Sequence, residues 1–206
     1  MNRSAESPEP LPEPLPERVP EPLPERVPER VMKVLVAGPV GVGKTTAVKS
    51  ASDVPILTTE TTPTDDTLLL KPSTTVALDF GVARLDDVRV VHLYGTPGQK
   101  RFDFMWEILR DGSAGVVILV DASDPDAIEG LGPYLETYAA LLEQRRVALG
   151  VTRLEVDAKD GLAPFRSHLG RIGASVPVFE VDPRSRADVL VLIRALLATT
   201  DVDLMS

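Results

Sequence analysis

Eight residues near the start of the chain combine three glycines, a lysine and a threonine at a spacing that suits phosphate binding. They read Gly38-Pro39-Val40-Gly41-Val42-Gly43-Lys44-Thr45, they fit the pattern G-x-x-x-x-G-K-[ST], and Thr46 follows them. Glycines let a backbone approach a phosphate closely, and main-chain N–H groups of such a loop and of the next helical turn point at the anion. Lys44 can reach the β- and γ-phosphates of a nucleotide, and the Thr45 hydroxyl can bind Mg²⁺.

The residues on either side place this loop between a strand and a helix. Residues 31–37 are an apolar run rich in β-branched side chains, which is typical of a buried strand. Residues 46–52 have a composition compatible with a helix. Because the pattern acts only between a strand end and a helix start, this context favours a phosphate loop over a chance glycine-rich turn.

The overall composition excludes several classes of protein. The chain has 206 residues, 43% of them apolar, a net charge of −9 and no cysteine. It therefore has no disulfide, thiolate metal site or cysteine nucleophile, and the negative charge argues against a general nucleic-acid binder. The sequence shows no signal-peptide core, no apolar run of membrane-spanning length and no glycine after Met1 for myristoylation. We expect a cytoplasmic protein with no direct membrane anchor.

Residues 1–30 differ from the rest of the chain. They hold nine of its 19 prolines, and the eight residues from Glu13 are repeated unchanged from Glu21. So much proline is incompatible with a helix interior or a central strand. We predict a disordered, extended arm over residues 1–30 and a folded domain over 31–206. The arm is either a docking segment or a solubilising tail.

Strand and helix patterns alternate after this arm. The predicted strands are 31–37, 75–80, 88–94, 115–121, 147–152 and 176–181. Helical patterns run over about 100–110, from near Pro133, over 161–171, and after the capping box Ser185–Asp188. Only residues 81–87 separate the second and third strands, which is too short for a helical crossover. These patterns predict an α/β fold of the P-loop NTPase type. Its six-stranded, mostly parallel sheet has one antiparallel edge hairpin, and helices cover both faces.

This order of elements resembles the small Ras-like GTPases. The resemblance is closer to the bacterial branch that includes the gliding-motility polarity GTPase and the actinobacterial conservon-type ATP/GTP-binding proteins. It covers residues 31–200, and three segments carry it: the phosphate loop, residues 75–81 (Thr-Val-Ala-Leu-Asp-Phe-Gly) and residues 92–99 (His-Leu-Tyr-Gly-Thr-Pro-Gly-Gln).

The resemblance implies roles for the glycine-rich turn at residues 95–99. Gly98 would offer its backbone N–H to the γ-phosphate, and Gln99 would orient the attacking water beside the catalytic Lys44. Ras-like proteins carry an aspartate that supports Mg²⁺ where this chain has Gly95. Asp79, on the neighbouring strand, is our candidate for restoring a carboxylate to the magnesium shell, and its alternative role is a strand-end hydrogen bonder.

The long segment from Asp53 to Ser73 occupies the place of the first switch loop. By the resemblance, Thr75 would contact Mg²⁺ beside Thr45, with Thr74 as the alternative. In the gliding-motility relative an arginine precedes this threonine and assists hydrolysis. This chain has Thr74 there, so we expect slow intrinsic turnover.

Recognition of the base falls, by the resemblance, on two later loops. Residues 152–155 (Thr-Arg-Leu-Glu) replace the Asn-Lys-x-Asp of Ras-like proteins, so Glu155, or Asp157 beyond it, could accept from guanine and Arg153 could lie over the base. Asp182 and Pro183 fall in the second loop. Guanine and adenine both remain open. The expected nucleotide contacts are Gly38, Val40, Gly41, Val42, Gly43, Lys44, Thr45, Thr46, Thr75, Gly98, Thr152, Arg153, Glu155, Asp182 and Pro183.

Together these features predict a switch that binds GTP or GDP with Mg²⁺ and hydrolyses GTP slowly. The resemblance implies a roadblock-type (longin-like) regulatory partner and, in the conservon setting, a histidine kinase. Trp106, after the second switch loop, is either a core contact or, as our hypothesis, a partner contact. Two alternatives are a P-loop ATPase or kinase that acts on a small molecule, and a scaffold that binds nucleotide without hydrolysing it.

Overall fold

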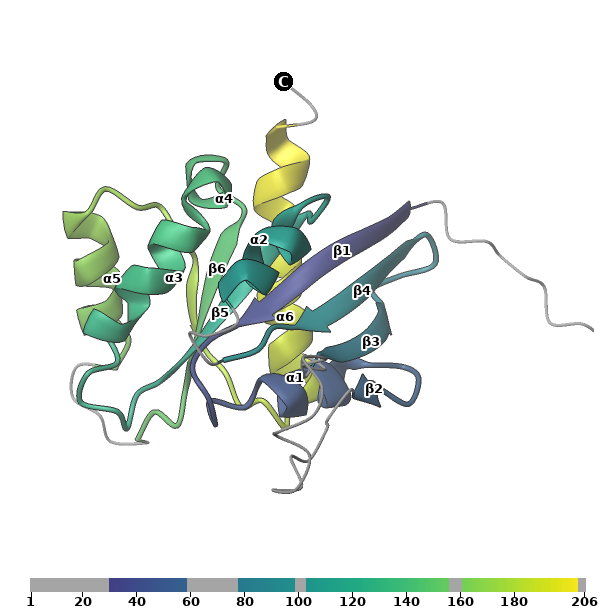
Figure 1. Ribbon diagram of the computed structural model, residues 1–206, viewed down its shortest axis with the longest axis horizontal. Coiled ribbons are helices and arrows are strands. Elements are labelled where there is room, and N and C mark those ends of the chain that lie inside the picture. Colours follow the sequence, from purple (N-terminus) through teal and green to yellow (C-terminus); the bar gives the residue numbers. More distant parts are fainter. Residues whose placement is uncertain (1–29, 59–77, 99–102, 156–160, 204–206) are drawn as a thin grey trace, which may run out of the picture.

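A seven-stranded sheet forms the centre of the computed structural model, which describes residues 30–58, 78–98, 103–155 and 161–203 (Figure 1). The order of the strands across the sheet is β2-β3-β4-β1-β5-β6-β7. The strands are β1 (Arg30–Ala37), β2 (Leu57–Thr58), β3 (Asp79–Arg84), β4 (Arg89–Gly95), β5 (Gly115–Asp121), β6 (Val147–Thr152) and β7 (Val178–Glu180). The first strand of the sequence, β1, thus lies in the middle of the sheet.

Helices cover both faces of the sheet (Figure 1). They are α1 (Lys44–Ala51), α2 (Asp103–Arg110), α3 (Gly132–Thr137), α4 (Ala139–Glu143), α5 (Ala163–Arg171) and α6 (Arg186–Asp203), with a 3-10 turn, η2 (Glu129–Leu131), before α3. Alternate residues of β1 enter different cores, as the period of a strand requires. Val34 and Val36 pack with α1 and α6, and Leu35 packs with α2 to α5.

The strand directions bring several loops to one edge of the sheet. β1 pairs in parallel with β4 and β5, β5 pairs in parallel with β6, and β6 pairs in parallel with β7, so their carboxyl ends lie at the same edge. β3 is antiparallel to β4, with Asp79 opposite Gly95, so β3 starts at that edge. Ligands of open α/β sheets bind beyond the carboxyl ends of the strands, and this edge positions the candidate site.

The predicted fold class is confirmed, with a different strand count. The sheet is mostly parallel, has an antiparallel edge and is covered on both sides. The seventh strand is the two-residue β2, which pairs with β3 through Leu57 and Phe80. Nothing in the sequence around Leu57 distinguishes so short a strand from a loop. The prediction of an extended arm over residues 1–30 lies almost wholly outside the described residues, since β1 starts at Arg30.

The boundaries of the hairpin were predicted wrongly. The second strand was expected at 75–80 with a turn at 81–87, but β3 runs to Arg84 and the turn is only Leu85–Val88. Gly81 instead lies within β3 under α1, where an added Cβ would be 2.9 Å from Val48 Cγ1 and 3.1 Å from Ser52. The glycine serves close packing of the helix on the strand.

Two helical predictions had different outcomes. The helix expected from Pro133 divides at Tyr138, where α3 ends and α4 begins. Half of the predicted capping box of α6 is present, because the Asp188 amide donates to the Ser185 hydroxyl at 3.3 Å. Asp188 Oδ1 accepts from the Ser185 hydroxyl at 2.9 Å, whereas the Ser185 amide bonds to the Asp182 carbonyl.

Among the described residues, no helix has both the length and the apolar character needed to cross a membrane.

We predict that Gly81→Ala destabilises the fold. The added methyl group would press on Val48 and Ser52, and overpacking of this kind lowers the free energy of unfolding by about 1–3 kcal/mol. Urea denaturation of the purified protein measures the change. Gly170→Ala in α5 is the matched control. Since nothing lies within 4 Å of its added Cβ, this variant should be as stable as the wild type or up to about 1 kcal/mol more stable. Equal stability of Gly81→Ala and the wild type would contradict the packing argument.

Candidate nucleotide-binding site

The glycine-rich loop connects the end of β1 to the start of α1, as its sequence predicts. Its glycines Gly38, Gly41 and Gly43 have φ values of 139°, 80° and 105°, which L side chains rarely adopt. Gly43 is the N-cap of α1 and no side chain caps the helix. The first-turn amides are therefore available to an anion, which the helix dipole also favours.

The side chain of Lys44 lies within the mouth of this loop. Its ammonium group donates to the carbonyls of Gly38 at 2.9 Å and Pro39 at 2.7 Å. Burial lowers the pKa of Lys44 to about 8, and the nearby Asp79 carboxylate opposes that shift. The loop thus holds a partly desolvated positive charge beside its own amides, where a phosphate would neutralise it.

A buried carboxylate, Asp79, joins two threonines at the start of β3. The Thr45 hydroxyl donates to Asp79 Oδ2 at 2.5 Å and the Thr58 hydroxyl donates to Asp79 Oδ1 at 3.0 Å. Asp79 is only 8% exposed. It lies opposite Gly95, where an added Cβ would be 3.0 Å from Asp79 Cβ. The carboxylate that the resemblance expects at position 95 therefore has no room there, and Asp79 provides one from the partner strand.

This set of oxygen atoms suits a magnesium ion. Mg²⁺ prefers hard oxygen ligands and in nucleotide sites uses one or two protein ligands, phosphate oxygens and waters. Thr45 and Asp79 provide a hydroxyl and a carboxylate next to the phosphate loop. No group of three or more histidine, cysteine, aspartate or glutamate side chains that could hold a metal occurs in the part of the chain that the structure describes. Such a group is not required here, because the triphosphate would complete the shell.

The threonine that bonds to Asp79 from β2, Thr58, was not among the residues predicted for the site. Thr58 bonds to Asp79 through the β2–β3 pairing, in which the two residues are opposite each other. The sequence did not single out Thr58. Thr75, which the resemblance expects to contact Mg²⁺, lies outside the described residues. Only knowledge of the strand register could have identified Thr58, because threonines are common throughout this segment.

The turn after β4 lies against the phosphate loop. An added Cβ at Gly98 would be 2.7 Å from Lys44 Nζ and 2.8 Å from the Val40 amide nitrogen. The Thr96 amide donates to the Val36 carbonyl at 2.9 Å and fixes the start of the turn to β1. The structure thus brings together Gly98, Lys44 and Val40, as expected, whereas Gln99 lies outside the described residues.

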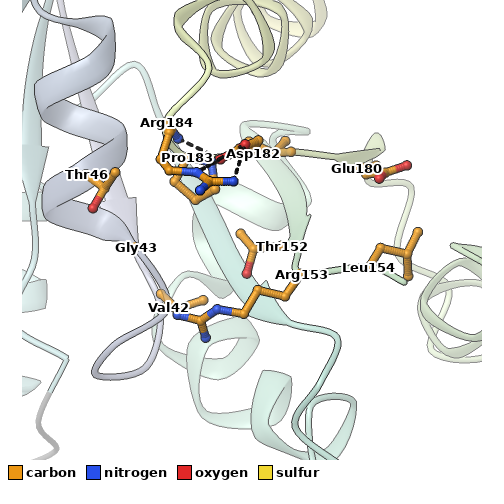
Figure 2. Close-up of a pocket in the computed structure, with 11 residues that line it drawn as sticks. Val42, Gly43, Thr46, Thr152, Arg153, Leu154, Glu180, Asp182, Pro183 and Arg184 are labelled. Carbon is orange, nitrogen blue, oxygen red and sulfur yellow. Dashed lines mark hydrogen bonds and ion pairs between the residues drawn. The ribbon is translucent and has the colours of Figure 1, made fainter. Parts of the chain in front are cut away.

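A cavity of about 600 Å³ opens next to the phosphate loop (Figure 2). Seven of the lining residues had been predicted as nucleotide contacts: Val42, Gly43, Thr46, Thr152, Arg153, Asp182 and Pro183. Leu154, Glu180, Val181 and Arg184 also line it. Glu155, one of two residues expected to accept from the base, is exposed and does not line this cavity, and the alternative, Asp157, lies outside the described residues. The loops expected to surround a base therefore do enclose a space, with Glu180 rather than Glu155 at its wall.

Arg153 links this cavity to the phosphate loop. Its guanidinium forms an ion pair with Asp121 at the end of β5 and donates to the Gly41 carbonyl at 2.9 Å. Figure 2 shows the side chain reaching across the cavity toward Val42. The sequence analysis predicted Arg153 here but not its partner Asp121. The bridge keeps the arginine stem extended beside the space for a ligand.

The loop between β7 and α6 has few free main-chain donors. The Val181 amide bonds to β6, the Asp182 amide bonds to Asp188 Oδ2 at 3.1 Å, and the Arg184 amide bonds to Asp182 Oδ1 at 2.9 Å. Pro183 has no N–H. The Asp182 carboxylate also accepts from the Arg184 guanidinium (Figure 2). A ligand would therefore meet side chains of this loop rather than its amides.

Trp106 does not face a partner. It is 3% exposed and belongs to the core under α2 to α5. The hypothesis that it forms a docking surface is wrong, because a large apolar ring at this amphipathic position of α2 is drawn into the core.

Comparisons with known proteins agree with a P-loop NTPase. A family model described as "Conserved hypothetical ATP binding protein" matches residues 55–141. The protein of Methanocaldococcus jannaschii named "Uncharacterized protein MJ1339" is 32% identical over 129 residues, which cover 63% of this chain and 73% of that protein. The crystal structure of the G domain of the T. maritima FeoB iron transporter matches with a TM-score of 0.57 and 19% identity, over 84% of this chain and 99% of that one.

These comparisons bear on part of the predicted resemblance. A nucleotide-binding P-loop protein is confirmed by the family model together with the G-domain fold. Membership of the gliding-motility or conservon branch remains a prediction. At 19% identity, the likeness to the G domain concerns the fold alone.

Nucleotide affinity should fall as the pH rises through about 8. Lys44 binds phosphate as an ammonium ion, and its lowered pKa of about 8 means that the free protein loses this charge above that pH. Titration with a fluorescent triphosphate analogue between pH 6.5 and 9.5 measures the effect. Lys44→Arg is the control, because its guanidinium stays charged and its affinity should not follow this pH dependence. The same pH profile in both proteins would contradict the assignment to Lys44.

Asp79→Asn should weaken the contribution of Mg²⁺ to binding. The variant keeps the size of the side chain but removes the charge next to Thr45. We expect metal affinity to fall by about 10- to 100-fold, the usual effect of losing such a partner. Binding of the triphosphate analogue is measured over a range of Mg²⁺ concentrations and in EDTA. Asp86→Asn, at a carboxylate bonded to Arg89 in the hairpin turn, is the control. An unchanged Mg²⁺ response in Asp79→Asn would exclude Asp79 from the metal site.

Proposed function

Because the chain belongs to the family of the M. jannaschii protein MJ1339 and has the fold of a P-loop NTPase, we propose that it is a nucleotide-controlled switch. It binds GTP with Mg²⁺ and hydrolyses it slowly to GDP and phosphate. One observation carries the proposal: Lys44, the Asp79–Thr45 pair and Gly98 converge at one edge of the sheet. These are the groups that a terminal phosphate and its metal ion require.

The phosphate loop supplies binding and charge stabilisation. Its amides and the first turn of α1 would hold the β- and γ-phosphates. Lys44 would neutralise charge that develops on the phosphate oxygens during transfer. Thr45 and Asp79 would hold Mg²⁺, which would act as a Lewis acid and withdraw negative charge from the phosphate oxygens. Gly98 would donate its amide to the γ-phosphate, and Gln99 would orient the water.

We expect slow turnover because the first switch segment has no arginine before Thr75. Position 74 carries threonine instead of the arginine that assists hydrolysis in the gliding-motility relative. An arginine at such a site contributes about 10³- to 10⁵-fold to the rate in related GTPases. A partner that inserts an arginine would therefore accelerate hydrolysis, which is typical of a regulated switch.

Two segments would respond to the γ-phosphate and present themselves to a partner. Thr58 lies in the first and Gly98 in the second, and both contact groups of the phosphate site. Large apolar side chains are exposed on β2 and on α2: Leu57 is 67% exposed and Ile108 is 61% exposed. We propose a roadblock-type regulatory protein as the partner, within a signalling system that includes a histidine kinase.

ATP is the second candidate ligand. The β7–α6 loop has no free amide for the O6 atom of guanine, because Pro183 has no N–H and the amides of Asp182 and Arg184 are engaged. The matching family model is described as ATP-binding. The preference for GTP is supported by the resemblance and by Arg153, which lies where Ras-like proteins place a lysine beside the base.

Analysis of co-purified nucleotide tests this function. The protein is denatured after purification in Mg²⁺, and the released small molecules are separated by chromatography. We expect GDP or GTP from the wild type and none from Lys44→Ala, since that variant loses the ammonium at the phosphates. Adenine nucleotide would overturn the base assignment. Partner binding that persists in Lys44→Ala without nucleotide would favour the scaffold alternative, and rapid transfer to a small-molecule acceptor would favour a kinase.

A further inference from the structure

Trp106 lies directly behind the turn that touches the phosphate loop. Its indole Nε1–H donates to the Pro97 carbonyl at 2.8 Å. The ring is buried and stacks on Tyr134 of α3, with 5.1 Å between ring centroids and 25° between their planes. The indole N–H therefore connects α2 to the turn.

The hydrogen bond from Trp106 holds the turn at Pro97, one residue before Gly98. The start of the turn is held by the Thr96 amide on β1, and the Pro97 carbonyl is held by Trp106. Gly98 then lies against Lys44 Nζ and the Val40 amide. Because the Pro97 carbonyl and the Gly98 N–H belong to the same planar peptide group, a shift at the Pro97 carbonyl also moves the Gly98 amide.

Burial makes this bond hard to exchange for another. A buried indole N–H needs a hydrogen-bond acceptor, and leaving one unsatisfied is disfavoured. Trp106 is 3% exposed, so water does not readily replace Pro97. A displacement of the turn therefore either breaks the bond or carries Trp106 and α2 along.

A second aromatic residue extends the contact to the far helices. The Tyr138 hydroxyl is buried and forms no hydrogen bond within the described residues. Burial raises the pKa of Tyr138. Tyr138, at the junction of α3 and α4, belongs to the same buried cluster as Trp106 and Tyr134.

We propose that Trp106 is a positioning residue for the terminal phosphate. Its indole N–H holds Pro97 so that the Gly98 amide is placed over Lys44, and the arrival or loss of the γ-phosphate reaches α2 and Tyr134 through this bond. The inference rests on the proposed nucleotide switch. It adds the residue that transmits the state of the site to the helices.

Trp106→Phe tests the inference, because it keeps an aromatic ring and removes the N–H donor. Affinities for GDP and for a non-hydrolysable GTP analogue are measured with Mg²⁺. We expect GDP affinity to change by less than about twofold and analogue affinity to fall about tenfold, the loss of one hydrogen bond of ordinary strength. Tyr134→Phe keeps the stacked ring and is the control, with the wild-type ratio of the two affinities expected.

A second variant covers the case in which Trp106→Phe does not fold. Trp106 is the sole tryptophan of the chain. It can therefore be replaced throughout by benzothienylalanine, which has sulfur in place of the N–H and nearly the same shape. The same loss of analogue affinity is expected. An unchanged ratio of the two affinities, or an equal loss for both nucleotides, would overturn the positioning role.

Fluorescence of the sole tryptophan separates this inference from the proposed function. In the wild type, the emission of Trp106 should differ between the GDP and the analogue complexes. If the wild type binds both nucleotides but its emission and the Trp106→Phe ratio do not change, only the positioning role fails. If the wild type binds no purine nucleotide, the proposed function fails and the inference with it.

Discussion

One buried carboxylate connects three separate segments of this site. Asp79 accepts from Thr45 at the start of α1 and from Thr58 in β2, and it faces Gly95 at the end of β4. A buried carboxylate is stable only when its charge is compensated by hydrogen bonds or by a cation. The phosphate loop and the two segments that follow it are thereby coupled through the Asp79 carboxylate, to which a magnesium ion would bind.

The antiparallel hairpin makes this arrangement possible. In a purely parallel sheet the first residue of β3 would lie at the opposite edge from the phosphate loop. Reversal of β3 places Asp79 next to the end of β4. Ras-like proteins carry an aspartate at the position of Gly95. In this chain Gly95 leaves room for Asp79, which provides a carboxylate from the neighbouring strand. Gly81 within the same strand lets α1 approach closely, which brings Thr45 within reach of Asp79.

The sequence predicted the parts of the site that depend on local pattern. The spacing of glycines and Lys44 predicted the phosphate loop, and strand-helix alternation predicted the layered fold. Contacts between segments that are far apart in the sequence were harder to predict. Thr58 reaches Asp79 through the register of β2 and β3. Asp121 has a role in the site because it pairs with Arg153. The burial of Trp106 depends on the helix face that meets the sheet. For Glu155, the match to a family position predicted a contact with the base, and the structure places this residue outside the lining of the cavity.

The central claim is that the amides and the ammonium group of one loop grip a polyphosphate while two neighbouring segments sense its last phosphate. Titration calorimetry of the full chain with non-hydrolysable GTP and ATP analogues tests it most directly, with and without Mg²⁺. The account predicts saturable binding of at least one analogue, strengthened by Mg²⁺, since Thr45 and Asp79 would hold the ion beside the phosphates. Absence of binding heat for both analogues at several temperatures, with Mg²⁺ present, would contradict it.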